Sequence, residues 1–222
     1  MAKLTLIRRL LKLVHPEGIP WPGSVLYNAL SSTVIFQRHY ELVADDVLQY
    51  CRQGSLLDIG TGPARLLLSL HQKCPQMKLL GIDSSPAMVT KAKENTAGVD
   101  SIEIKQGSAD KIPFPDNSFD IVISTASIHH WKHPTQSLNE TYRVLKPAGF
   151  ALIYDLVTDT PKSILADCRR QFGKFKTTLF WLHSFEEPFY NQRNFQSLAE
   201  PTLFKKGQTR FLGLLCCLIL KK

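Results

Sequence analysis

The spacing of apolar residues changes repeatedly along the chain, and each change marks a short strand or a helix. From residue 55 to residue 156, apolar runs bounded by turn residues alternate with segments in which apolar residues recur every three or four positions. The runs predict strands over Ser55–Ile59, which should be buried, and over Lys78–Asp83, Ile102–Gln106, Phe119–Thr125 and Phe150–Leu156. The segments between them predict helices over Pro63–Lys73, Pro86–Glu94 and Pro134–Val144. Alternating strands and helices pack as a parallel sheet covered on both faces, so we expect an α/β, doubly wound fold.

The two ends of the chain follow other patterns. Residues 3–14 place apolar and basic residues on different helical faces, which predicts a basic amphipathic helix that caps the fold or contacts a membrane surface. Residues 201–222 predict two strands joined near Arg210–Gly213, and the second, apolar throughout, should lie inside the sheet. The segment 145–150, LKPAGF, predicts a helix end followed by a tight turn. Further helices are expected over Ser24–Phe36, Gln37–Cys51 and Asn191–Ala199.

Composition narrows the class of protein. Hydrophobic residues make up 44% and charged residues 21% of the 222 residues, as in ordinary globular domains. No apolar run approaches the ~20 residues that span a bilayer, and the start lacks a signal-peptide pattern, so we expect a cytoplasmic protein. The 5 cysteines lack metal-ligand spacing, which predicts reduced thiols and no metal site. The net charge of +8 is spread along the chain without a nucleic-acid reading module, so it supports at most a mild attraction to anionic surfaces.

A glycine-rich turn follows the first predicted strand. The sequence SLLDIGTGPAR begins at Ser55. At the change from strand to helix it contains Asp58, Gly60, Thr61 and Gly62. Such a turn aims the free N–H groups and the positive dipole end of the helix at a ligand above the strand. Arg65 stands where a dinucleotide-binding turn needs its third glycine, which disfavours a nicotinamide-dependent oxidoreductase. An ordinary turn in another doubly wound protein is the alternative.

Two further motifs agree with this turn in order and separation. Asp83 ends the second predicted strand, where a carboxylate can accept hydrogen bonds from two ribose hydroxyls or cap the next helix, whose N-cap should be Ser84 or Ser85. The sequence GSADKIPFPDNSFD follows the third strand. With the spacing D-x-G-x-G-x-(G/A) in the turn, these motifs resemble those of class I S-adenosylmethionine-dependent methyltransferases. Within that class the chain is most similar to the small-molecule or lipid type, the ubiquinone/menaquinone-type subgroup.

The resemblance implies S-adenosylmethionine as cofactor and assigns contacts to individual residues. Ser108 and Ala109 would flank the adenine, and Met88 would pack on the adenine face or belong to the core. Ser108 departs from the aspartate that the family usually has there, so Asp110 or a water would bond the adenine amino group instead. The cofactor-binding residues implied in this way are Asp58, Gly60, Thr61, Gly62, Asp83, Ser84, Met88, Ser108, Ala109 and Ser124.

A pair of histidines follows the fourth predicted strand. By the resemblance, residues 124–130 face the amino-acid end of the methyl donor and the methyl acceptor. Histidine is the usual general base near neutral pH, so His129 and His130 are the candidate catalytic residues. The alternative is that one packs in the core and the other caps the helix that begins at Pro134. The chain lacks the (D/N)-P-P-(Y/F) tetrad of enzymes that methylate amide or adenine nitrogen, which argues against a nucleic-acid substrate.

Together these patterns predict one methyltransferase domain over residues 1–222, with a Rossmann-like, mostly parallel seven-stranded sheet. Its expected parts are an N-terminal helical cap (1–52), a cofactor-binding core (55–156), an acceptor-lid insertion (157–200) and a terminal antiparallel strand pair (201–222). Aromatic residues gather in the lid, which with the basic helix suits an apolar or amphipathic acceptor such as a quinone, a phospholipid or a lipophilic metabolite. A non-catalytic cofactor-binding or partner-binding module remains an alternative.

Overall fold

The computed structural model describes residues 34–174, 177–178 and 189–222. The helix predicted over residues 3–14, most of the helix predicted over Ser24–Phe36 and the aromatic residues between 179 and 188 lie outside these ranges. Within the ranges, no helix is both long enough and apolar enough to cross a membrane.

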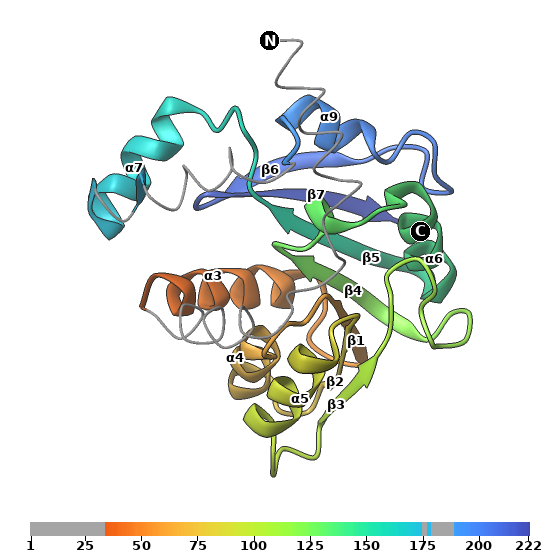
Figure 1. Ribbon diagram of the computed structural model, residues 1–222. Coiled ribbons are helices and arrows are strands. Elements are labelled where there is room, and N and C mark those ends of the chain that lie inside the picture. Colours follow the sequence, from red (N-terminus) through yellow and green to blue (C-terminus); the bar gives the residue numbers. More distant parts are fainter. Residues whose placement is uncertain (1–33, 175–176, 179–188) are drawn as a thin grey trace.

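The strands make one sheet. They are β1 (Ser55–Ile59), β2 (Lys78–Asp83), β3 (Ile102–Gln106), β4 (Phe119–Thr125), β5 (Leu145–Asp155), β6 (Gln208–Leu212) and β7 (Leu215–Lys221). Their order in the 7-stranded sheet is β3-β2-β1-β4-β5-β7-β6 (Figure 1). The pairs from β3 to β5 are parallel, whereas β7 runs antiparallel between β5 and β6. The predicted fold class is confirmed, including the antiparallel pair and the position of the last apolar strand inside the sheet.

Helices cover both faces of this sheet (Figure 1). They are α3 (Val34–Tyr50), α4 (Arg65–Lys73), α5 (Pro86–Asn95), the 3-10 helix η1 (Ile128–His130), α6 (Pro134–Val144), α7 (Lys162–Phe172) and α9 (Gln192–Ser197). Successive strand residues such as Leu56 and Leu57 belong to separate apolar clusters, because side chains alternate between the two faces of a strand. Residues of α3, α4, α5 and α7 join one cluster, and residues of α6, α9 and η1 join the other.

Several predicted boundaries are wrong, among them the junction expected near Arg210–Gly213, since β6 continues to Leu212. The break expected between Phe36 and Gln37 does not exist, because α3 runs through it without a glycine or proline to stop it. The segment LKPAGF was expected to be a turn, yet β5 already begins at Leu145. The turn survives as an irregularity inside the strand: Leu145 pairs with Phe119 and Phe150 with Ile121, and Ala148 between them has a φ of 63°. A bulge of this kind bends the strand while keeping it in the sheet and parallel to β4.

Helix α3 is fixed to the sheet by a buried polar cluster. The Asp46 carboxylate accepts a hydrogen bond from the Tyr154 hydroxyl of β5 at 2.6 Å and pairs with the Arg210 guanidinium of β6. Burial raises the pKa of the Tyr154 hydroxyl well above its usual value, and the nearby Cys217 and Asp46 raise it further, so the hydroxyl stays a donor. Breaking a buried pair of this type is costly, and α3 is therefore held in one position over the strand ends.

Candidate active site

The turn between β1 and α4 is held by β2 and by the loop that follows β4. The backbone N–H groups of Gly60 and Thr61 both donate to the carbonyl of Ile82, at 2.8 and 2.9 Å. Gly60 has a φ of 73°, and a Cβ built on it would lie 2.2 Å from the Ser127 Oγ. The sequence suggested that this glycine leaves room for a ligand. The structure gives another reason, since the left-handed backbone and the close approach of Ser127 both require glycine.

Below this turn lies a cavity lined by three groups of residues. The turn contributes Asp58, Gly60, Thr61 and Gly62, the end of β4 contributes Thr125 and Ala126, and α3 contributes Phe36, His39 and Tyr40. Three segments that are distant in sequence therefore meet at the carboxyl end of β1, where ligands bind in open α/β sheets.

Two polar atoms in the cavity wall are unsatisfied. Asp58 Oδ1 and Thr61 Oγ1 are buried, and neither has a hydrogen-bond partner among the described residues. Burial raises the pKa of Asp58 to about 7; the neighbouring Thr61 hydroxyl lowers it and the Asp83 carboxylate raises it. Because unpaired buried polar atoms are costly, this pair marks a place where a ligand supplies the missing partner.

Asp83 is the acid at the end of β2. Its Oδ2 accepts a hydrogen bond from the Gly62 N–H and its Oδ1 accepts one from the Ser85 N–H, both at 2.9 Å. Burial raises the pKa of Asp83, and these two donors lower it in part. The carboxylate thus fixes the glycine turn to β2, while the second lone pair of each oxygen remains for a ligand hydroxyl. Ser85 caps α5 through the Met88 N–H, so the two alternative N-caps are resolved in favour of Ser85.

The remaining cofactor-binding candidates lie at the ends of neighbouring strands. After β3, the Ser108 hydroxyl donates to Asp110 Oδ1 at 2.5 Å, so an acid does stand beside the serine that departs from the family pattern. Met88 is buried. Ser124 is fully buried, and its hydroxyl donates to the Ile59 carbonyl at 2.8 Å. That bond joins β4 to β1 and uses the Ser124 hydroxyl proton within the sheet.

His129 is held by an acid that sequence reasoning missed. Its ring Nδ1 lies 2.8 Å from Asp155 Oδ2, and its backbone N–H donates to the same oxygen at 3.2 Å. The rings of His130 and Phe189 lie on the His129 ring, each with its centroid 4.0 Å away. Asp155 ends β5 as Asp83 ends β2, and this position at a strand end was the signal that could have identified it.

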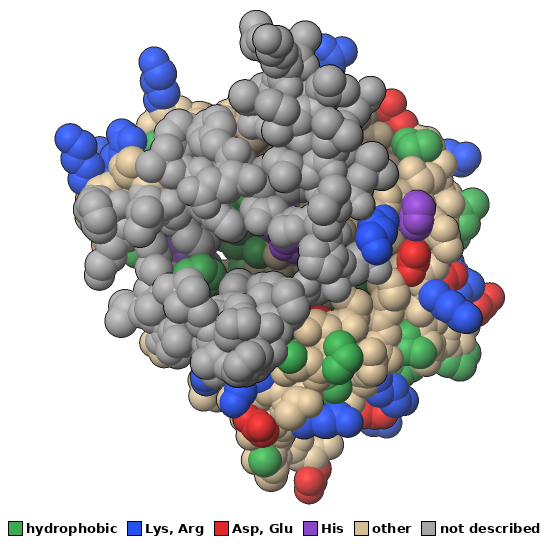
Figure 2. Space-filling view, viewed as in Figure 1, with side chains coloured by type: hydrophobic (Ala, Val, Ile, Leu, Met, Phe, Trp, Pro, Cys, Tyr) green, Lys and Arg blue, Asp and Glu red, His purple; other side chains and the backbone are tan. Residues whose placement is uncertain are grey.

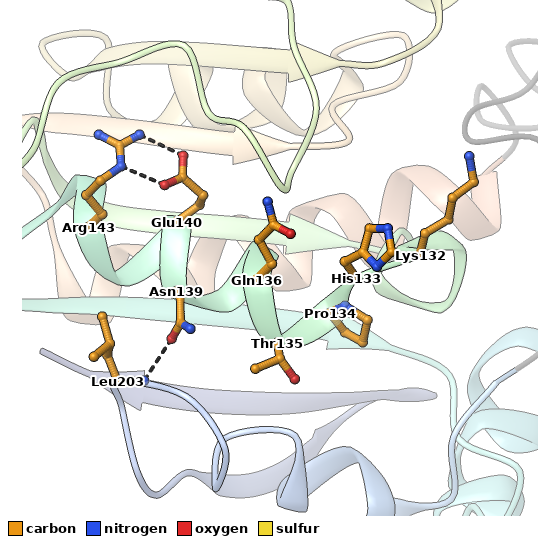
Figure 3. Close-up of a pocket in the computed structure, with 9 residues that line it drawn as sticks. All are labelled: Lys132, His133, Pro134, Thr135, Gln136, Asn139, Glu140, Arg143 and Leu203. Atoms are coloured by element: carbon orange, nitrogen blue, oxygen red, sulfur yellow. Dashed lines mark hydrogen bonds and ion pairs between the residues drawn. The ribbon is translucent and has the colours of Figure 1, made fainter.

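A second, more open groove runs along α6 (Figure 3). Arg143 and Glu140 form an ion pair in it, and that bond is the main cause that lowers the pKa of Glu140. Asn139 Oδ1 accepts a hydrogen bond from the Leu203 N–H at 2.8 Å. None of the residues predicted to bind cofactor or to act in catalysis lines this groove, so the groove is separate from the cavity at β1.

Comparison with known proteins agrees with this geometry. Residues 57–153 match the family model described as a methyltransferase domain. The chain is 29% identical over 168 residues to a demethylmenaquinone methyltransferase of Chlorobaculum parvum, covering 71% of this chain and 68% of that protein. It is 31% identical over 145 residues to the ubiquinone/menaquinone biosynthesis C-methyltransferase UbiE of Geobacter sulfurreducens, covering 63% of this chain and 56% of that protein.

The fold is also shared with solved structures. The crystal structure of a proposed S-adenosyl-L-methionine-dependent methyltransferase from Methanococcus maripaludis superposes with a TM-score of 0.73 at 23% identity, covering 94% of this chain and 95% of that one. The strand order, the glycine turn after β1 and the matched domain thus lead to one conclusion. Residues 57–153 are a methyltransferase domain of the S-adenosylmethionine-dependent class.

Proposed function

We propose that this chain transfers a methyl group from S-adenosylmethionine to a reduced quinone or a similar apolar aromatic acceptor. The observation that carries the proposal is the contact between the glycine turn and the loop after β4. Ser127 packs on Gly60, two residues before His129, so the unsatisfied cavity and the ring cluster around His129 are neighbours. The names of the two relatives, one acting on demethylmenaquinone and one in ubiquinone/menaquinone biosynthesis, support an acceptor of this class.

The residues at the ends of β1, β2 and β3 fit S-adenosylmethionine. Asp58 and Thr61 have unsatisfied polar atoms for the polar amino-acid part, and the free lone pairs of Asp83 suit the ribose hydroxyls. Ser108 and Ala109 would lie along the adenine, with Ser84 and Met88 close to them. When bound, the cofactor supplies a methyl group that its sulfonium already activates, so the protein mainly orients the reactants.

The ring cluster fits a planar acceptor. His129 and His130 follow β4, and the Phe189 ring packs against the His129 ring. Aromatic faces bind planar, apolar molecules well, whereas a small polar amine would gain little from them. A reduced quinone carries phenolic hydroxyls, and loss of a hydroxyl proton makes the ring more nucleophilic. A histidine beside it would supply the base.

We further propose that residues 3–14 bring the enzyme to the membrane surface that holds such an acceptor. Along the right and lower parts of the face seen in Figure 2, basic side chains are interspersed with acidic ones. Co-sedimentation with anionic vesicles at low and high salt tests this. Binding that fades with salt and is lost when residues 3–14 are deleted supports it, and no binding at low salt contradicts it.

The catalytic proposal is tested by methyl transfer from radiolabelled S-adenosylmethionine to demethylmenaquinol, with histamine as a polar control acceptor. We expect label in the quinol and none in histamine. Label in histamine alone would contradict the acceptor class. Calorimetric titration with S-adenosylmethionine and with NAD is run in parallel. Binding of the first without transfer to any acceptor would indicate a non-catalytic module, and binding of NAD alone would indicate an oxidoreductase.

A further inference from the structure

Asp155 is a fully buried carboxylate whose hydrogen bonds fix His129. It is 0% exposed, and its Oδ2 accepts from both the backbone N–H and the ring Nδ1 of His129. Its Oδ1 accepts from the Leu156 N–H at 2.8 Å, which fixes the carboxylate on its own strand. A carboxylate held in this way can hold a ring in turn, and it leaves no freedom for the His129 side chain.

This geometry selects one tautomer of His129. A carboxylate only accepts hydrogen bonds, so the Nδ1 that faces it carries the proton. The hydrogen bonds that the structure gives His129 go through its backbone N–H and Nδ1, and none joins its Nε2 to a described residue. Nε2 is therefore the basic nitrogen. The rings of His130 and Phe189 pack against the imidazole, each with its centroid 4.0 Å away.

We propose that Asp155 is a positioning residue that keeps His129 in the Nδ1–H form, so that His129 Nε2 is the base that takes the acceptor's hydroxyl proton. The proposal rests on the proposed function and assigns the base to His129 rather than His130. As the acceptor O–H bond breaks, an N–H bond forms at Nε2 and the Asp155 carboxylate faces the new imidazolium. A buried anion stabilises that cation as it forms.

The step balances for transfer to a ring carbon. The bond between the ring carbon and the methyl group forms as the sulfur–methyl bond breaks, with its electron pair remaining on sulfur. The hydrogen on that ring carbon then moves to the oxygen, which restores the hydroxyl. His129 releases its proton to solvent, so one proton leaves for each methyl group transferred.

Few other titratable groups face the pair in the described part of the chain. His130 lies on one face of the His129 ring. Cys216 of β7 lies near Asp155; burial raises the pKa of its thiol to about 12, and the Asp159 and Asp155 carboxylates add to this. The thiol therefore stays neutral near pH 7, and Asp155 is the anion that balances a charged His129.

The first experiment reads the tautomer directly by ¹⁵N NMR of histidine-labelled protein and needs no acceptor. We expect His129 as the Nδ1–H tautomer in the native protein. In Asp155→Asn, the amide can donate to Nδ1, so the tautomer should change to Nε2–H. A native His129 in the Nε2–H form would overturn the assignment, whatever acceptor the enzyme proves to use.

The second experiment measures kinetics of Asp155→Asn and His129→Asn with the reduced quinone. We expect each to lower kcat by about 10²-fold, with KM and the Kd for S-adenosylmethionine changed by less than about threefold. Asp120→Asn is the control. This carboxylate bonds Ser55 and Lys146 near the amino-terminal ends of β1 and β4, at the opposite end of the strands from His129, so kcat should be unchanged. A kcat within threefold of the native value in folded Asp155→Asn would overturn the proposal. Absence of quinol methylation by the native enzyme would contradict only the proposed function, because the tautomer still tests Asp155.

Discussion

The two sides of the site use buried acids in opposite ways. On the donor side, at the ends of β1 and β2, Asp58 keeps a buried oxygen without a partner among the described residues, and burial raises its pKa to about 7. On the proposed acceptor side, at the ends of β4 and β5, both Asp155 oxygens accept hydrogen bonds from other groups of the chain. The difference distinguishes two roles for a buried acid. An oxygen without a hydrogen-bond partner in the protein indicates ligand binding, whereas a carboxylate whose oxygens are both bonded by the protein positions another side chain.

Asp83 lies between these two cases. One of its oxygens binds the glycine turn and the other the start of α5, yet each keeps a lone pair. It therefore resembles Asp155 in holding the protein and Asp58 in facing a ligand. Variants that remove one function at a time can sharpen the comparison.

The largest expected effect comes from a larger side chain at Gly60, where the turn after β1 meets Ser127 of the loop after β4. In Gly60→Ala the new Cβ would collide with Ser127 while the backbone is strained, so we expect the free energy of unfolding to fall by about 2–4 kcal/mol, with loss of cofactor binding. Gly98→Ala is the matched control, because its φ is 80° and nothing lies within 4 Å of a built Cβ. It should lose only about 1 kcal/mol or less in urea unfolding.

A second substitution distinguishes the collision with Ser127 from the strain of the left-handed backbone at position 60. Adding Ser127→Gly to Gly60→Ala removes both colliding atoms and should recover the larger part of the lost stability. Equal losses in Gly60→Ala and Gly98→Ala would show that the loop after β4 does not press on the turn.

The next effect concerns Asp83. Asp83→Ala removes charge-assisted bonds to the ribose and to the turn, worth about 1.5–3 kcal/mol each, so the Kd for S-adenosylmethionine should rise at least about tenfold. Calorimetry measures the affinity, and urea unfolding of the ligand-free protein measures the structural share. If the Kd is unchanged, Asp83 only holds the turn and belongs with Asp155 in the comparison.

Asp58 predicts a pH dependence of cofactor binding. Its pKa of about 7 means that it changes from mostly protonated to mostly ionised between pH 6 and pH 8. S-adenosylmethionine carries positive charge, so its affinity should rise about tenfold across that range as the anion forms. In Asp58→Asn the same titration should be flat.

The same shift acts on stability with the opposite sign. The pKa of Asp58 is higher in the folded protein than the usual 3.8, so the folded state binds more protons and its stability falls as pH rises from about 4 to about 7. Asp58→Asn should remove that fall in the ligand-free protein. A wild-type stability that does not decline over this range would show that Asp58 is not buried as a neutral acid.

The smallest expected effect is a change in the free energy of unfolding when either of two alanines with left-handed backbone is replaced by glycine. Ala148 of β5 is exposed with a φ of 63°, so Ala148→Gly should raise the free energy of unfolding by about 0.5–1 kcal/mol. Ala64 of the glycine turn has a φ of 60° but is fully buried, so loss of its methyl group, about 0.8 kcal/mol, should cancel the gain. Equal gains in urea unfolding would contradict this reasoning.

The sequence predicted strands and motifs better than side-chain partnerships. The strands from β1 to β4 match their predicted bounds because turn residues stop each apolar run. Helix α4 begins at Arg65 rather than Pro63, since the left-handed Ala64 delays it. Asp155 was overlooked because the predicted strand continued to Leu156, and because its bond to His129 spans 26 residues. The Asp46–Tyr154 bond spans 108 residues, a separation at which periodicity carries no information.

The order of the strands also constrains how the chain assembles. β7 follows β6 in the sequence but lies between β5 and β6 in the sheet (Figure 1). During synthesis β6 therefore emerges before the strand that it pairs with, and its backbone groups stay unpaired until β7 has followed. The Lys222 ammonium then bonds the carbonyls of Tyr142 and Leu145 at the end of α6. Among the strands of the described sheet, β7 thus emerges last, while the strands from β1 to β5 can already be paired.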